Sequence, residues 1–205
     1  YEYTRWFDLS RKWDHLPGDI TIIPEHPSIV KSRPIAGDNA NSVLLNLDKV
    51  RHFIFLNDNV PFTQKMDKVI FRGKVGVKPV RKEFLEMYFD HPMCDLGDVS
   101  RDAPEKWKTD KKTLYDHLKY KFILALEGND VASNLKWVMS SNSIAVMPKP
   151  TYETWFMEGK LIPNYHYIEI KADYSDMEER LRYYIEHPDE AQRIIDNAHE
   201  YIKQF

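Results

Sequence analysis

The chain has 205 residues, of which 42% are hydrophobic, 30% are charged and 13% are aromatic, and its formal net charge at pH 7 is −3. This composition is typical of a soluble globular protein with one main core, and the slight negative charge argues against a nucleic-acid partner. The single cysteine, Cys94, excludes an internal disulfide framework, and no apolar run reaches transmembrane length.

The first 60 residues are irregular and rich in proline. We expect a short helix within residues 1–16, a short strand over 19–23, and a strand or short helix over 43–47. Because the sequence opens on Tyr1 rather than methionine, we expect a piece of a longer protein. Residues 1–60 are therefore predicted to form a partial N-terminal lobe.

From residue 61 onwards, strand-like and helix-like segments alternate. The strands are expected over 68–73, 93–99, 120–126, 143–147 and 165–170, and the helices over 79–89, 112–118, 131–140 and 176–187. This alternation predicts an α/β domain over 61–187, with a Rossmann-like parallel sheet and helices on both faces. A C-terminal helix is expected over 188–205, since Pro188 suits a first helical turn.

The junction after strand 120–126 is the first candidate site. Gly128 ends the strand, and Asn129 and Asp130 are favoured N-cap residues for a helix expected from Val131. The first N–H groups of a helix lack partners within it, and the helix dipole is positive there, so a diphosphate would fit. The alternative, about equally supported by this stretch alone, is an ordinary strand-to-helix turn without a ligand.

The sequence lacks the motifs that mark several well-known kinds of active site. The chain contains no G-x-x-x-x-G-K, G-x-G-x-x-G, H-E-x-x-H, G-x-S-x-G or Asp-x-Asp. The missing glycine fingerprint disfavours a Rossmann-like oxidoreductase. Metal-dependent nucleotide-sugar transferases use the Asp-x-Asp pair to hold their divalent ion, so arginine, lysine and helix N-termini remain as diphosphate ligands, and we expect no metal and no cofactor.

A series of ordered blocks resembles glycosyltransferase family 90, which includes fungal capsule-associated proteins, animal protein O-glucosyltransferases and bacterial lipopolysaccharide-modifying enzymes. The blocks are Phe71-Arg72-Gly73, Arg81, Tyr120-Lys121-Phe122, Gly128 to Trp137, Pro148 to Phe156 and Pro163 to Tyr167. Residues 29–35 and the run Glu127-Gly128-Asn129-Asp130 resemble the bacterial branch most. The resemblance covers nearly the whole chain.

This resemblance implies a GT-B-like architecture of two lobes, in which residues 1–60 lie on the acceptor side and residues 61–187 bind the donor. The implied reaction is metal-independent and inverting, and moves a sugar from a nucleotide-diphosphate donor, a UDP-sugar in first place. The implied acceptor is lipopolysaccharide or another cell-surface glycan. A cytoplasmic location is expected, with peripheral association at the inner face of the cytoplasmic membrane, through the acceptor, as an option.

The resemblance also implies a set of donor-binding residues. They are Arg72, Gly73, Arg81, Gly128, Asn129, Asp130, Val131, Ala132, Ser133, Asn134 and Lys136. Arg81 matches an arginine that contacts the diphosphate in eukaryotic members; the alternative is a solvated helix charge, and replacing Arg81 by alanine is expected to leave the fold intact. Arg72 fits a structural ion pair equally well. Eukaryotic members have arginine where Asn134 stands, so Lys136 is expected to supply that charge.

An inverting transfer needs a carboxylate that takes the acceptor proton. The family places this base before the extended block matched by residues 28–34, so Asp19 is the first candidate and Asp38 the alternative. Either can instead cap a turn, and a base outside these 205 residues is a third option. The alternative function is a non-catalytic nucleotide- or sugar-binding module of the same fold.

Overall fold

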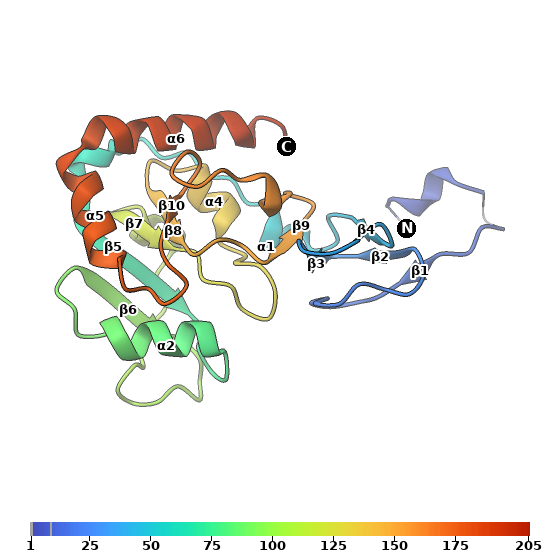
Figure 1. Cartoon of the computed structure of the whole chain (residues 1–205), viewed down its shortest axis with the longest axis horizontal. Helices are drawn as coiled ribbons and strands as arrows, with labels where there is room; N and C mark the ends of the chain where they lie inside the picture. The colour runs from blue at the N-terminus through green and yellow to red at the C-terminus, as the bar shows by residue number, and fades with distance from the viewer. Residues whose placement is uncertain (1, 9) are drawn as a thin grey trace.

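A computed structural model describes residues 2–8 and 10–205, and its centre is a five-stranded parallel sheet. The strands lie in the order β10-β8-β7-β5-β6, with bounds β5 (Met66–Gly73), β6 (Cys94–Asp98), β7 (Tyr120–Leu124), β8 (Ile144–Met147) and β10 (Ile168–Glu169). Every neighbouring pair is parallel. The predicted parallel α/β sheet is confirmed (Figure 1).

Helices cover both faces of this sheet. Phe122 and Leu124 of β7 belong to one buried cluster and Ile123 to the other, because successive side chains of a strand point to opposite faces. The helices are α2 (Pro79–Tyr88), α3 (Leu114–His117), α4 (Leu135–Met139), α5 (Met177–Glu186) and α6 (Pro188–Ile202). α2 and α5 pack on the first face and α4 on the second, while α6 contributes to both clusters.

The loop between β7 and α4 differs from the prediction. α4 begins at Leu135 rather than Val131, so Asn129 and Asp130 are not its N-cap residues. The side chain of Asn134 donates to the Leu124 carbonyl (2.8 Å), and the Asp130 carboxylate pairs with Lys31 Nζ (2.8 Å). These bonds hold residues 128–134 as an open loop, and a helix dipole at Gly128 is excluded as the source of anion binding.

The N-terminal part has a small parallel sheet of its own, in the order β1-β2-β4. Its elements are η1 (Thr4–Trp6), β1 (Asp14–His15), β2 (Ser28–Val30), β3 (Ser32–Pro34), β4 (Ser42–Leu44) and α1 (Lys49–His52). Of the strand or short helix predicted over 43–47, the structure shows the strand, β4. The helix predicted within 1–16 is wrong beyond the short η1, and the strand predicted over 19–23 is absent; residues 1 and 9 lie outside the described part.

Both corrections have physical reasons. Trp6 (78% exposed) and Phe7 (51% exposed) find little to pack against, and a short helix needs tertiary packing to persist in water. Ile20 is held instead by the Ser32 hydroxyl group, which bonds both its N–H and its carbonyl (3.1 Å each), so its backbone does not join a sheet.

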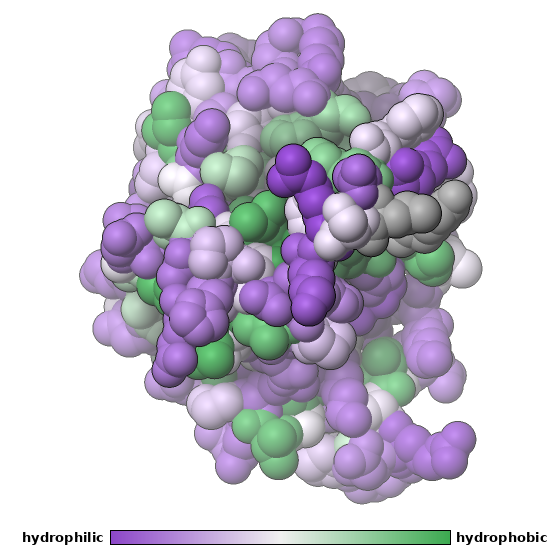
Figure 2. All heavy atoms as spheres, turned by 90° about the vertical axis from the view of Figure 1, so that its right-hand side faces the viewer, coloured by the Kyte–Doolittle hydropathy of each residue, from purple (hydrophilic) through white to green (hydrophobic). Residues whose placement is uncertain are grey.

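The N-terminal part has little hydrophobic core. Among its described residues up to Val60, Val30 is the buried hydrophobic side chain, whereas Val50 (85%) and Ile22 (65%) are exposed. Figure 2 shows this end of the molecule, where hydrophobic side chains lie scattered between hydrophilic ones. Antiparallel pairing of β3 with β9 (Tyr152–Thr154) attaches this part to the rest, and Arg33 pairs with Glu153 across it (2.7 Å).

His52, the last residue of α1, makes the stability of the fold depend on pH. The ring is 2% exposed, and neither ring nitrogen has a hydrogen-bond partner among residues 2–8 and 10–205. Burial, together with the charges of Lys136 and Lys31, lowers the pKa of His52 from 6.5 to about 4. Between these values the unfolded chain binds a proton that the folded chain does not, so stability falls as the pH falls from 6.5 towards 4.

We therefore expect the wild-type protein to lose on the order of 2 kcal/mol more stability than His52→Leu when the pH is lowered from about 7.5 to about 5. Urea unfolding of both proteins at the two pH values measures the difference. Equal losses in both proteins would show that His52 is not responsible.

Candidate functional site

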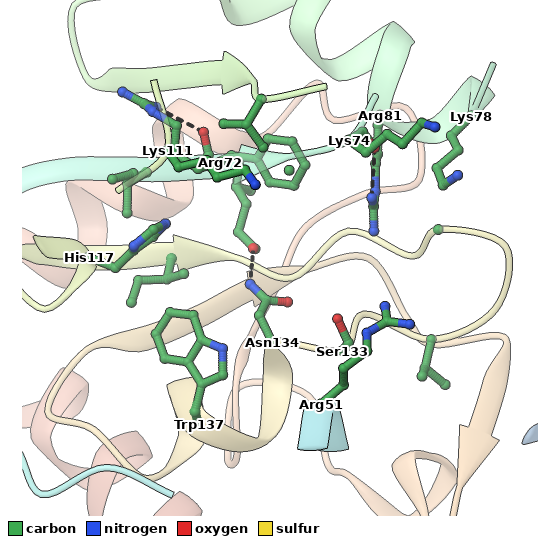
Figure 3. A pocket seen from close by; sticks show the side chains of 18 of the residues that line it. Arg51, Arg72, Lys74, Lys78, Arg81, Lys111, His117, Ser133, Asn134 and Trp137 are labelled. Atoms are coloured by element: carbon green, nitrogen blue, oxygen red, sulfur yellow. Dashed lines mark hydrogen bonds between the residues drawn. The ribbon is translucent and has the colours of Figure 1, made fainter. Parts of the chain in front are cut away.

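A cavity of about 500 Å³ lies beyond the carboxyl ends of β5 and β7. Its walls are the loop from Gly73 to Lys78, the loop from Gly128 to Asn134, the start of α2 and the region of α3 (Figure 3). Asp19 and Arg51 reach it from the N-terminal part. The carboxyl ends of parallel strands are where open α/β sheets bind ligands.

Cations dominate the lining of this cavity. They are Arg51, Arg72, Lys74, Lys78, Arg81, Lys111 and Lys112, against the two carboxylates of Asp19 and Asp130. The chain as a whole has a net charge of −3, so this local excess of positive charge is a property of the site. Such a lining concentrates anions and suits phosphate groups, which accept charge-assisted hydrogen bonds from guanidinium and ammonium groups.

Arg81 lies in the first turn of α2 and joins two loops of the site. Its guanidinium donates to the carbonyl groups of Lys74 (2.8 Å), Leu126 (2.9 Å) and Glu127 (3.1 Å). Burial lowers the pKa of Arg81 to about 10, which still leaves the group charged at neutral pH. The solvated-charge alternative does not describe this side chain, and the expectation that alanine would leave the fold intact conflicts with these bonds.

The approach of Arg81 explains the glycine at position 128. A Cβ atom added to Gly128 would lie 3.0 Å from a terminal nitrogen of Arg81, which is closer than ordinary contact. With a side chain there, the guanidinium would have to shift slightly away from the loop. Gly128 therefore suits this close packing.

Arg72 also lines the cavity, but its charge is already balanced. The guanidinium forms an ion pair with the Asp95 carboxylate and donates to the carbonyls of Asp95 (2.8 Å) and Phe71 (2.9 Å). The Tyr120 hydroxyl group donates to the same carboxylate. The structural ion-pair alternative therefore describes the geometry of Arg72.

The structure brings most of the predicted donor-binding residues to the cavity. These are Arg72, Gly73, Arg81, Gly128, Asn129, Asp130, Val131, Ser133 and Asn134. It does not bring Ala132 or Lys136 there. Ala132 is buried in the hydrophobic cluster beneath the loop. Lys136 is 1% exposed and pairs with Glu158 at 2.5 Å, so it cannot supply the charge expected of it.

The two candidate bases are placed differently. Asp19 lines the cavity, where its carboxylate pairs with Lys31 and accepts from Asn129 Nδ2 (2.9 Å). Burial by itself raises the pKa of Asp19, but the bonds from Lys31 and Asn129 outweigh it and hold the pKa below its usual value. Asp38 lies in an exposed turn, where it accepts from the Ala40 amide (3.2 Å), and it does not line the cavity.

The sequence analysis missed several lining residues. They are Arg51, Lys74, Lys78, Lys111, Lys112, His117 and Trp137. The density of basic residues around positions 72–82 was a usable signal for Lys74 and Lys78. His117 and Trp137 carry no such signal, because α3 and α4 come together only in the folded chain.

Two kinds of feature are absent from the described residues. No group of three or more His, Cys, Asp or Glu side chains there could hold a metal ion. None of the described helices is long and apolar enough to cross a membrane.

Comparison with known proteins gives consistent matches. The chain is 44% identical over 202 residues to O-glucosyltransferase LpsA of Dichelobacter nodosus, a match that covers 98% of this chain and 63% of that protein. It is 27% identical over 197 residues to protein O-glucosyltransferase 3 of Rattus norvegicus, covering 90% of this chain and 38% of that one. It is 26% identical over 153 residues to protein O-glucosyltransferase 1 of Homo sapiens, a match that covers 70% of this chain and 38% of that protein. The chain thus spans less than two thirds of each relative.

The family comparison agrees with the site. The family model described as glycosyl transferase family 90 matches residues 43–205. This range contains the parallel sheet and every cation of the cavity, whereas Asp19 and Asp38 precede it. The resemblance seen in the sequence is therefore confirmed, and the chain belongs to glycosyl transferase family 90.

Proposed function

We propose that this chain carries the donor site of a glycosyltransferase that moves a sugar from a nucleotide-diphosphate donor to a cell-surface glycan such as lipopolysaccharide. The observation that carries the proposal is the cationic cavity at the carboxyl ends of β5 and β7. The relatives are named O-glucosyltransferases, which makes glucose the sugar to test first.

In this proposal the diphosphate lies at the end of the cavity lined by Lys74, Lys78 and Arg81. The amino-terminal end of the ten-residue helix α2 adds its dipole, and no acidic residue occupies its first turn. Positive groups at this place would stabilise the nucleoside diphosphate as its bond to the sugar breaks. No metal ion is assigned a role, in line with the missing Asp-x-Asp pair.

The remaining parts of the reaction follow from the same arrangement. An inverting transfer needs a base on the acceptor side, and Asp19 is the candidate that reaches the cavity. Residues 1–60 would belong to the acceptor-side lobe of a GT-B-like enzyme and residues 61–187 to the donor domain. The helix at 188–205 would belong with the donor domain, since α6 packs into both clusters of the sheet. A cytoplasmic enzyme meeting a lipid-linked acceptor at the inner membrane face fits this scheme.

Binding of a nucleoside diphosphate is expected to be independent of divalent metal. Calorimetric titration of the chain with UDP in the presence of EDTA and in the presence of Mg²⁺ should give equal affinities. Binding that appears only with Mg²⁺ would contradict the proposal. If UDP-glucose binds but is neither hydrolysed nor used for transfer to lipopolysaccharide, the non-catalytic module becomes the better description of this chain.

A matched pair of variants tests where the diphosphate binds. Lys78→Ala removes a cation of the cavity and should weaken UDP binding about threefold to tenfold. Lys82→Ala removes a cation from the same helix that pairs with Glu86 (3.6 Å) and does not line the cavity. The Lys82 variant should bind as wild type does; equal effects of both substitutions would move the diphosphate elsewhere.

A further inference from the structure

We infer that the opposite end of the cavity is a nucleobase subsite in which His117 Nε2 accepts a hydrogen bond from the N3–H group of uracil. The inference rests on the proposed function, because it needs the diphosphate to lie beside Lys74, Lys78 and Arg81. It adds the residue that would select the base of the donor.

The two ends of the cavity differ in character. Lys74, Lys78 and Arg81 lie together at one end in Figure 3, and His117 and Trp137 lie at the other, with Asn134 between them. The apolar side chains of Ile70, Leu114 and Ile123 also line the cavity. A nucleotide has the same two halves, a charged diphosphate and a flat base with a polar edge, so its chemistry matches this change of lining.

The hydrogen bond of His117 to the backbone decides which of its ring nitrogens can donate to a ligand and which can accept. Its Nδ1 lies 2.8 Å from the carbonyl oxygen of Thr113, which only accepts, so Nδ1 carries the proton. Burial, and the charges of Arg72 and Lys112, lower the pKa of His117 and favour the neutral ring. A neutral imidazole with a proton on Nδ1 has an acceptor at Nε2. The ring is held edge-on against Trp137, with 5.6 Å between the ring centroids.

An acceptor surrounded by cations distinguishes the four bases. Uracil presents the N3–H donor between two carbonyl acceptors, so it fits an imidazole acceptor flanked by positive donors. Lys111 and Lys112 line the cavity with His117 and can supply these donors. Cytosine and adenine present a ring acceptor at the corresponding position, and guanine places a second donor where the cations stand. Each of these three bases would therefore leave a donor or an acceptor without a partner, which is costly in a buried site.

The test compares UDP, CDP, 3-methyl-UDP and inorganic pyrophosphate by calorimetry in three proteins: wild type, His117→Phe and His117→Gln. Phenylalanine keeps a ring against Trp137 but has no acceptor, whereas the amide oxygen of glutamine restores one. We expect wild type to bind UDP about threefold to tenfold more tightly than CDP or 3-methyl-UDP, since one neutral hydrogen bond is at stake. His117→Phe should lose this preference and bind pyrophosphate as wild type does, and His117→Gln should retain part of the preference.

The outcomes separate the two levels of the argument. If wild type binds UDP, CDP and 3-methyl-UDP equally, or if His117→Phe keeps the full preference for UDP, the base subsite is refuted while the diphosphate site stands. If neither pyrophosphate nor any nucleotide binds to wild type, both the base subsite and the proposed function are refuted. Melting temperatures of the three proteins show whether a lost preference merely reflects lost folding.

Discussion

Replacing Lys136 by alanine is expected to destabilise the fold by about 3–5 kcal/mol, because it leaves a carboxylate buried without its counter-charge. Lys136 and Glu158 are each 1% exposed and lie 2.5 Å apart. Glu158 also accepts from the Thr154 amide (2.7 Å) and hydroxyl group (3.0 Å), so the carboxylate cannot turn to solvent without breaking these bonds. Urea unfolding at neutral pH measures the loss.

A double variant separates the charge from the packing. Lys136→Met combined with Glu158→Leu removes both charges and keeps apolar volume, and it should recover most of the lost stability. Lys136→Met alone should remain strongly destabilised. If Lys136→Ala unfolds at the wild-type urea concentration, the pair is exposed in solution, and Lys136 returns as a candidate ligand of the donor.

Replacing Arg81 by alanine is expected to change both stability and donor binding. The substitution removes the donors for the carbonyls of Lys74, Leu126 and Glu127, which should cost about 2–3 kcal/mol of folding free energy. It also removes a cation at the diphosphate end of the cavity, so UDP affinity should fall about tenfold or more. Arg81→Lys keeps the charge but loses the forked geometry, so both effects should be intermediate.

These two effects are measured separately. Urea unfolding gives the stability, and calorimetry at a temperature where each variant remains folded gives the affinity. Lys82→Ala serves as the control for a lost charge on the same helix. A folded Arg81→Ala protein that binds UDP as wild type does would show that Arg81 only joins the two loops.

The sheet and helices after residue 61 were predictable because the local sequence preferences and the tertiary packing favour the same structure there. The apolar run at 120–126 became the buried central strand β7, and Pro79 begins α2 as its fixed backbone geometry allows. The helix predicted from Val131 failed because the side chains of Asp130 and Asn134 bond to Lys31 and Leu124 instead of capping a helix. Local propensity does not reveal such competing partners.

The sequence by itself determined the parallel α/β architecture, the family, and the positions of Arg81 and the loop at 128–134, because each depends on residues close together in the chain or on the order of motifs. The tertiary structure alone decided which charges line the cavity. Arg51 and Lys111 reach one cavity from segments far apart in the sequence, while Lys136 is withdrawn from it by Glu158. A charged side chain can serve a cavity only where the fold leaves it facing that cavity and does not bury it against a counter-charge, and that depends on contacts between distant residues.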